Sequence, residues 1–291
     1  MIERTPVKEV YISNAPYDFG TMHEGGRYAP DALREAGLIE SLSEKGVEVV
    51  DGKDRRINFQ SSDFGAHRSA LVVTNQLYAR TLEIHESGRF PLTIGGDHSI
   101  TVGPALATQQ YFGKIGLISI DRHTDMQKNY FFANYLNCAN VMRVLTDKSE
   151  RPAGIMNPDL DPIDPKNTAV IGVNEMTEYV HYDDEHMVVT TWCGGIEKAV
   201  EEVIACASDG TNGIYLTVDI DALRPDLAPG VNYPGGQLDM AQMKFLISAI
   251  AKTGRLLGAD LVEVNPEKDE DGITVKSAIE IIGTILESRE S

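Results

Sequence analysis

The chain has 291 residues, of which 42% are hydrophobic, and its formal net charge is −18. This length predicts one catalytic domain over residues 1–291, and the negative charge argues against a nucleic-acid or anionic-membrane partner. The three cysteines, Cys138, Cys193 and Cys206, have no paired metal-ligand spacing, so a reducing compartment is favoured over a disulfide framework. We read no signal peptide and no membrane-spanning run, and therefore expect a cytoplasmic protein.

Apolar runs typical of strands alternate with amphipathic stretches along the whole chain. The predicted strands are Val7–Ser13, Val47–Val50, Phe90–Ile94, Ile115–Ile120, Thr168–Val173, Met187–Thr191, Ile214–Val218 and Leu257–Val264. The predicted helices are Pro30–Ile39, His67–Ser87, Thr101–Tyr111, Ile196–Ala207, Met240–Lys252 and Val275–Glu287. This alternation predicts a three-layer α/β/α fold, in which helices cover both faces of a mostly parallel eight-stranded sheet.

Six candidate metal ligands follow three of these predicted strands. They are His98, Asp121, His123, Asp125, Asp219 and Asp221. Residues two apart in an extended chain point the same way, so the members of each cluster can converge. In parallel sheets ligands bind beyond the carboxyl ends of the strands, where all the clusters lie. A lone Asp-x-Asp is usually a turn or a cap, but four carboxylates and two imidazoles in one place predict two divalent cations.

The segment Met126–Ala139 leaves the central acidic motif and is predicted to be a loop, as are residues 51–66 and 146–166. It carries four aromatic residues, Tyr130, Phe131, Phe132 and Tyr135. Their side chains either form a pocket wall or lid beside the metal site, or simply pack the loop against the domain. The sequence favours neither alternative.

Taken together, the motifs resemble those of the ureohydrolase superfamily, the arginase and agmatinase group. Its signatures correspond to Gly95-Gly96-Asp97-His98-Ser99, to Asp121-Arg122-His123-Thr124-Asp125 and to Asp219-Ile220-Asp221 followed by Ala228-Pro229-Gly230. Residues 15–20 and 29–39 resemble the arginase N-terminal region, and Leu261–Pro266 resembles its last strand with the substrate glutamate. One such motif alone would be weak evidence, whereas all of them in order along nearly the whole chain are strong evidence.

The resemblance implies an arginase-like fold and a homo-oligomer, trimeric or hexameric, with two Mn²⁺ per chain. One ion would be bound by His98, Asp121, Asp125 and Asp219, and the other by Asp121, His123, Asp219 and Asp221. Oxygen-rich coordination with only two imidazoles suits Mn²⁺ better than Zn²⁺. A metal pair of this kind activates water, here for attack on a guanidinium carbon that yields urea and an amine.

The same resemblance assigns roles to other side chains. Asp125 would orient the attacking water, and Glu263 would pair with the guanidinium nitrogens, since a carboxylate matches that planar fork. The implied substrate-binding residues are Gln127, Asn137, Asn140, Glu175, Thr177 and Glu263.

The chain also departs from the family pattern. The histidine that is thought to shuttle protons, in a His-Gly pair after the central motif, is missing from Asn137–Met142. Asn174–Thr177 replaces an Arg-Asp-x-Asp segment, Arg122 stands where a small residue is usual, and Val231–Tyr233 replaces a threonine- and glycine-rich turn. The metal ligands therefore match the family pattern, whereas the residues expected to select the substrate differ from it. We therefore expect L-arginine to be a poor substrate.

Two other functions remain open from the sequence. The same metal pair could hydrolyse a related C–N bond, formimino or amide, or the protein could bind metal without catalysis. Cys138 fits a small buried hydrophobe better than a nucleophile. His181 or His186 could replace the missing shuttle, although a solvated loop is favoured, and His23 could edge the site.

Overall fold

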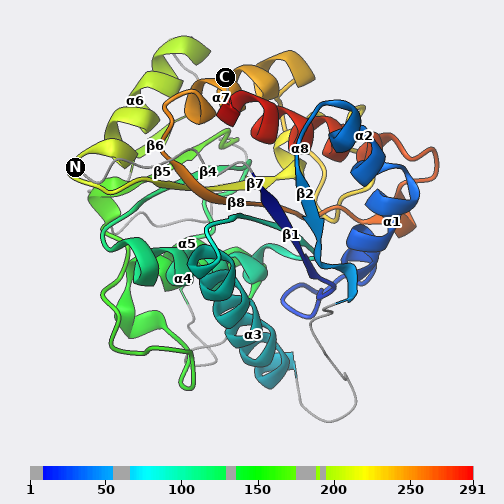
Figure 1. Ribbon diagram of the computed structural model, residues 1–291. Coiled ribbons are helices and arrows are strands. Elements are labelled where there is room, and N and C mark those ends of the chain that lie inside the picture. The colour runs from blue at the N-terminus through cyan, green and yellow to red at the C-terminus, as the bar shows by residue number, and fades with distance from the viewer. Residues whose placement is uncertain (1–8, 55–65, 129–135, 175–187, 191–194, 291) are drawn as a thin grey trace.

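The computed structural model describes residues 9–54, 66–128, 136–174, 188–190 and 195–290. An eight-stranded sheet with the order β2-β1-β3-β8-β7-β4-β5-β6 forms its centre (Figure 1). The strands are β1 (Val10–Ala15), β2 (Val49–Asp51), β3 (Phe90–Gly95), β4 (Gly116–Ile120), β5 (Thr168–Ile171), β6 (Val188–Thr190), β7 (Ile214–Asp219) and β8 (Leu256–Val262). Neighbouring strands of this sheet pair in parallel, which confirms the predicted sheet.

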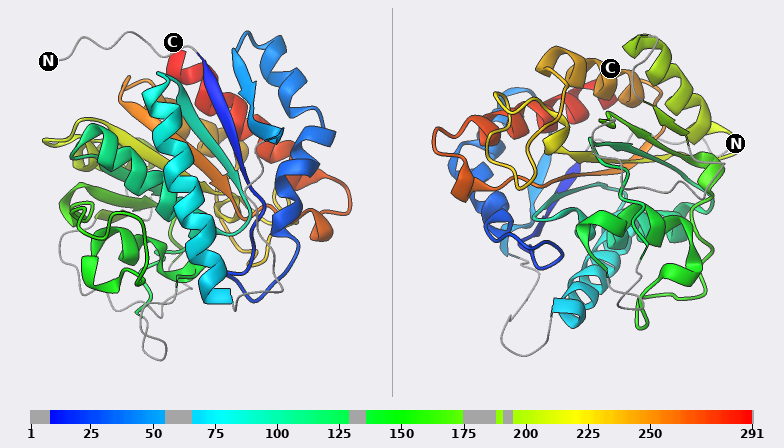
Figure 2. Two further views of the ribbon diagram at one scale, coloured as in Figure 1. Left: turned by 60° about the horizontal axis from the view of Figure 1, so that its bottom comes forward. Right: turned by 180° about the vertical axis from the view of Figure 1, so that it is seen from behind.

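Helices cover both faces of the sheet, as Figures 1 and 2 show. One layer contains α1 (Ala29–Glu35), α2 (Leu38–Glu44), α6 (Ile196–Ser208), α7 (Met240–Ala251) and α8 (Ile273–Glu290). The other layer contains α3 (Ala66–Glu86), α4 (Val102–Phe112) and α5 (Val141–Thr146). The predicted three-layer α/β/α architecture is therefore confirmed. None of the described helices is long and apolar enough to cross a membrane.

The central strands are buried along their whole length. Strands β3, β4, β7 and β8 are buried at every position, as expected for parallel strands covered on both faces. Side chains alternate between the two cores: Leu216 and Val218 of β7 pack under α6 to α8, whereas Tyr215 packs on the side of α3 to α5. Because of this alternation, side chains two residues apart at the end of a strand point toward the same face of the sheet.

One predicted helix differs from the structure, and one short helix was not predicted. The predicted helix Pro30–Ile39 is two helices, because Gly37 adopts a left-handed φ of 89° and begins α2 in a new direction. Helix α5 was not predicted, since its six residues are too few for a clear helical period. Residues 146–166 form the expected loop with short 3₁₀ turns, whereas the aromatic residues at 130–132 and 135 lie outside the described residues.

The four central strands position the candidate site. They are neighbours in the order β3-β8-β7-β4, and parallel pairing brings their carboxyl ends to one edge of the sheet. Short 3₁₀ helices begin there, among them η3 (His98–Thr101) after β3 and η8 (Ile220–Ala222) after β7. Two of the three motifs singled out in the sequence lie in these turns, and the third, residues 121–125, directly follows β4.

Candidate metal centre

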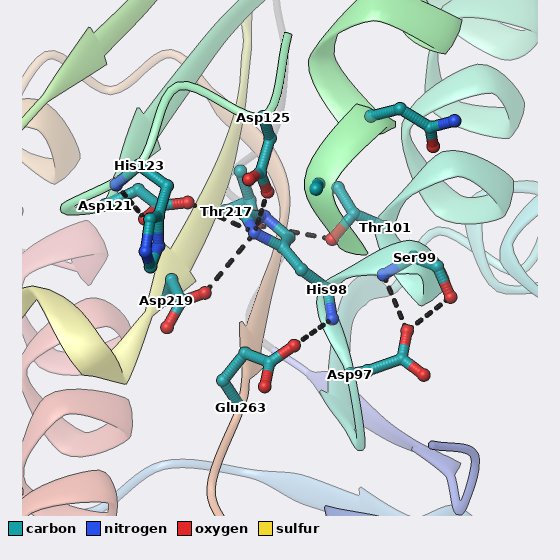
Figure 3. A network of polar contacts seen from close by, with 12 residues as sticks. Asp97, His98, Ser99, Thr101, Asp121, His123, Asp125, Thr217, Asp219 and Glu263 are labelled. Atoms are coloured by element: carbon teal, nitrogen blue, oxygen red, sulfur yellow. Dashed lines mark hydrogen bonds and ion pairs between the residues drawn. The ribbon is translucent and has the colours of Figure 1, made fainter. Parts of the chain in front are cut away.

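The candidate ligands lie together at the carboxyl edge of the sheet: Figure 3 labels His98, Asp121, His123, Asp125 and Asp219, and Asp221 contacts His123. Nδ1 of His98 lies 2.8 Å from an oxygen of Asp125, 3.2 Å from Asp121 and 3.4 Å from Asp219. Nδ1 of His123 lies 3.2 Å from an oxygen of Asp221 and 3.5 Å from the other oxygen of Asp121. The cluster gathers residues from β3, β4 and β7 that are more than a hundred positions apart in the chain.

Five of the six side chains form two groups that could each hold a metal ion, and Asp125 belongs to neither group. His98, Asp121 and Asp219 form one group, and Asp121, His123 and Asp221 form the other. Within each group the ligand atoms lie within 4.8 Å of one another. Asp121 belongs to both groups, which is the geometry of a carboxylate that bridges two ions. Asp219 belongs only to the first group, although it was also predicted to bridge.

The spacing of each motif has a local backbone reason. The first aspartate of each motif accepts the backbone N–H two residues later: Asp121 from His123 at 2.7 Å and Asp219 from Asp221 at 2.9 Å. Asp97 accepts the N–H of Ser99 in the same manner. Such side-chain turns end the strand and turn the residue at the third position toward the first. In Asp121 and Asp219 the same carboxylate thus shapes its own loop and keeps its second oxygen for the cluster.

A buried hydrogen-bond chain orients His98. Its Nε2 lies 2.9 Å from Oγ1 of Thr217, and the Thr217 hydroxyl donates to Oδ1 of Asp260 at 2.5 Å. The other oxygen of Asp260 accepts the hydroxyl of Tyr215. Because the threonine proton is committed to Asp260, its oxygen must accept from Nε2–H. His98 therefore donates through Nε2 and turns Nδ1 toward the cluster, where a metal ion would displace its proton.

Cations would satisfy the donor atoms of the cluster better than hydrogen bonds between these atoms do. Nδ1 of His98, Oδ2 of Asp121 and Oδ1 of Asp221 are buried and have no hydrogen bond of good geometry among the described residues. Buried polar atoms without partners are costly, and a cation satisfies several of them at once. All three atoms belong to residues of the two groups, so these groups fit a pair of divalent ions.

The pKa values of these residues reflect the crowding of charge. Burial raises the pKa of Asp221 to about 6, against the opposing effect of His123. Burial and the neighbouring Asp221 and Asp121 raise the pKa of Asp219 well above its usual range. Burial lowers the pKa of His123, but its contacts with Asp121 and Asp221 outweigh burial and bring it to about 12. The cluster thus gathers more negative charge than it can hold alone, and protons compete there with metal ions.

Glu263 lies beside the cluster at the end of β8. Its Oε1 accepts the backbone N–H of His98 at 2.8 Å, and its own N–H donates to Gly96 at 2.8 Å. Its φ is 67°, and Asp125 has a φ of 49°, so two predicted site residues adopt the left-handed conformation that side chains disfavour. Burial, with Asp219 and Asp97 nearby, raises the pKa of Glu263 well above its usual range. A cationic partner would hold this carboxyl in its charged form.

The remaining predicted site residues lie around or outside this cluster. Asn137 precedes η4 (Cys138–Asn140) as its N-cap and Asn140 ends it, and the side chain of Asn137 accepts the N–H of Ala139 while that of Asn140 accepts the N–H of Asn137. Gln127 is exposed. Glu175 and Thr177, like His181 and His186, lie outside the described residues. Burial raises the pKa of the Cys138 thiol well above its usual value, which argues against a thiolate nucleophile.

The sequence analysis missed the residues behind the ligands. Thr217 and Asp260 were not singled out, because each lies inside a run that was read only as a strand. Asp260 is a fully buried acid between Ala259 and Leu261, and a charged residue within an otherwise apolar strand is the signal that could have revealed it.

The whole chain was also compared with known proteins. Residues 8–287 match the sequence model of the arginase family. The chain belongs to the arginase family. An arginase of Staphylococcus aureus (strain COL) is 29% identical over 97% of this chain and 98% of its own length. The crystal structure of arginase from Bacillus subtilis superposes with a TM-score of 0.83 at 28% identity, covering 96% of this chain and 98% of that one.

An agmatinase structure is also similar. A hypothetical agmatinase from Burkholderia thailandensis has a TM-score of 0.75 and 26% identity, covering 96% of this chain and 84% of that one. Membership of the arginase family confirms the resemblance read from the motifs and the predicted enzyme class, a metal-dependent hydrolase of guanidino C–N bonds. The relatives carry different substrate names, so family membership leaves the substrate open.

Proposed function

We propose that this protein is a binuclear manganese amidinohydrolase that converts a guanidino compound other than L-arginine into urea and an amine. The observation that carries the proposal is the pair of ligand groups sharing Asp121, with Glu263 beside them. When bound, the two ions would supply an activated water molecule near neutral pH. Residues 1–291 would form one catalytic domain, cytoplasmic and assembled as a trimer or hexamer.

The donor set supports the assignment of the metal ligands. His98, Asp121, Asp125 and Asp219 would bind one ion, while Asp121, His123, Asp219 and Asp221 would bind the other. Four carboxylates to two imidazoles are a hard, oxygen-rich set, which favours Mn²⁺ over Zn²⁺. The Thr217–Asp260 chain would hold the ring of His98 by its Nε2–H and so aim Nδ1 at the ion.

Two side chains would act on the reacting groups. Glu263 would accept hydrogen bonds from the guanidinium, a charge-assisted contact that holds the carbon in place for attack. Asp125, whose carboxylate lies 2.8 Å from Nδ1 of His98, would accept a hydrogen bond from the attacking water and hold its proton. The chain has no histidine over residues 137–142, so protonation of the leaving amine would pass through Asp125.

Release of urea is the direct test. The Mn²⁺-reconstituted protein would be assayed with L-arginine, guanidino acids, modified arginines and decarboxylated analogues. We expect urea from at least one of them and little from L-arginine. Release of ammonia from formimino or amide compounds, without urea from any guanidino compound, would replace the proposal with hydrolysis of a related C–N bond. No turnover with two bound ions per chain would mean a metal-binding protein without catalysis.

A further inference from the structure

Solvent reaches the ligand cluster mainly past His123. The His123 side chain is 29% exposed, whereas those of the other five ligands are between 1% and 8% exposed. The cluster is therefore closed on the sides formed by β3, β7 and β8. A substrate that places its guanidinium between Glu263 and the ligands must keep its tail on the side of His123.

Tyr233 flanks this opening. Its ring centroid lies 6.2 Å from that of His123 and 5.2 Å from that of His23, in both cases nearly edge to face. The Tyr233 side chain is half-buried. Segments that follow β1, β4 and β7 thus contribute three rings to one wall of the opening, and Tyr233 is the middle one.

Arg122 holds the backbone that carries Tyr233. It lies between the ligands Asp121 and His123 and is 9% exposed. Its Nη1 donates to the carbonyl oxygens of Tyr233 at 2.8 Å and of Pro234 at 2.9 Å. A Cβ on Gly235 would lie 2.9 Å from Cζ of Arg122, so the guanidinium packs directly on the loop. The metal motif and the Tyr233 loop are therefore joined by two hydrogen bonds and by direct packing.

The same loop is also held from the other side. The backbone N–H of Asn265 donates to Gly230 at 2.7 Å. The Asn265 side-chain nitrogen donates to Asn232 at 2.8 Å and to the carbonyl of Glu24, next to His23, at 2.9 Å. Asn265 is fully buried and follows Glu263 by two residues. Anchored on both sides, the loop cannot move Tyr233 aside at low cost.

We propose that Tyr233, positioned by Arg122, determines substrate specificity by admitting guanidino compounds with unbranched tails and excluding those with a branched α-carbon. The inference rests on the proposed function and names the substrate class of that site. In L-arginine three methylene groups separate the guanidinium nitrogen from the α-carbon, so the branch would lie in the part of the substrate that extends past His123 toward Tyr233. An unbranched methylene chain passes the ring face, whereas a branch meets a wall that is fixed from both sides.

A matched pair of compounds tests this. L-Arginine and 5-guanidinopentanoate have the same length and differ only in the α-amino group. For each compound, kcat/KM is measured by urea release, and Kd is measured by calorimetry on the Mn²⁺-loaded protein. The parent should prefer 5-guanidinopentanoate by both measures. Tyr233→Thr should reduce this preference by about tenfold or more, as expected for one steric contact in a pocket. Tyr233→Phe, which keeps the ring, should retain the preference.

The positioning role of Arg122 is tested by its effect on the substrate preference that depends on Tyr233. Arg122→Met removes both hydrogen bonds to the loop and should reduce the preference in the same direction, while Arg122→Lys should keep part of it. Combining Arg122→Met with Tyr233→Thr should change the preference by less than about twofold beyond Tyr233→Thr alone, because coupled residues are not additive. Metal content should stay at two ions per chain in these variants. Additive effects would overturn the positioning role of Arg122.

The two proposals fail in different ways. An unchanged preference in Tyr233→Thr would overturn the specificity role while the parent still releases urea. If the parent releases urea from neither compound, the proposed function loses its support, and the calorimetric Kd values alone decide the inference. Equal Kd values for the two compounds in the parent would then overturn it.

Discussion

Replacing Glu263 with glutamine separates substrate binding from metal binding. Oε1 of Glu263 already accepts the N–H of His98 at 2.8 Å, which leaves Oε2 as the oxygen free for a guanidinium. Glutamine retains one oxygen for His98 but turns the other position into a donor that faces the guanidinium N–H groups. A hydrogen bond to a charged group contributes about 1.5–3 kcal/mol, so we expect a loss of about 2–3 kcal/mol in transition-state stabilisation. This corresponds to a decrease of about 30- to 160-fold in kcat/KM.

The assay compares Glu263→Gln with Glu267→Gln, an exposed glutamate four residues further along the chain. Urea release gives kcat/KM on the best guanidino substrate, and elemental analysis gives the metal content. Metal content should match the parent, because Glu263 belongs to neither ligand group. Loss of metal with normal affinity for a guanidino ligand would refute the reasoning, as would a decrease in kcat/KM no larger than that of Glu267→Gln.

Four further predictions can be checked independently. Elemental analysis should approach two Mn²⁺ per chain in the parent and fall clearly below two in Asp219→Ala, whereas Asp226→Ala, an exposed aspartate paired with Arg224, should match the parent. Thr217→Val should weaken metal affinity by about 10- to 100-fold in a chelator competition, because His98 loses the acceptor that fixes its tautomer. Burial lowers the pKa of His85 from 6.5 to about 4, so its contribution to stability is complete above pH 6.5 and is lost as the pH falls toward 4. Chemical denaturation should therefore show the parent losing about 2 kcal/mol more than His85→Gln between pH 7 and pH 5. The pH–rate profile should lack a limb from the titration of a free imidazole. This prediction would be disproved if substitution of a non-ligand histidine abolished turnover while metal stayed bound.

The strands and the ligand motifs could be predicted because both depend on local sequence. Buried parallel strands are continuous apolar runs, and all eight predicted runs overlap the observed strands. Asp121 and Asp219 each accept a backbone N–H two residues ahead, so the motif spacing itself encodes the turn. A pattern contained in five neighbouring residues is visible in the sequence before any fold is known.

The residues that support the ligands could not be predicted in this way. Thr217 meets His98 across 119 positions, and Arg122 meets Tyr233 across 111. Neither contact leaves a spacing that can be read along one segment, since each depends on the order of the strands in the sheet. Arg122 was noticed only as a departure from a family pattern, and its contact with the loop required the fold.

This difference explains why the reaction class is easier to infer than the substrate. The ligands are held by turns that each motif builds for itself, so they keep their geometry when neighbouring loops change. The opening past His123 is built from segments after several strands, where Arg122 and Tyr233 meet only in the folded chain. A change in one loop can therefore alter which tail is admitted without disturbing the metal ligands. For this reason, compounds that differ only in their tails are the most informative ones to assay.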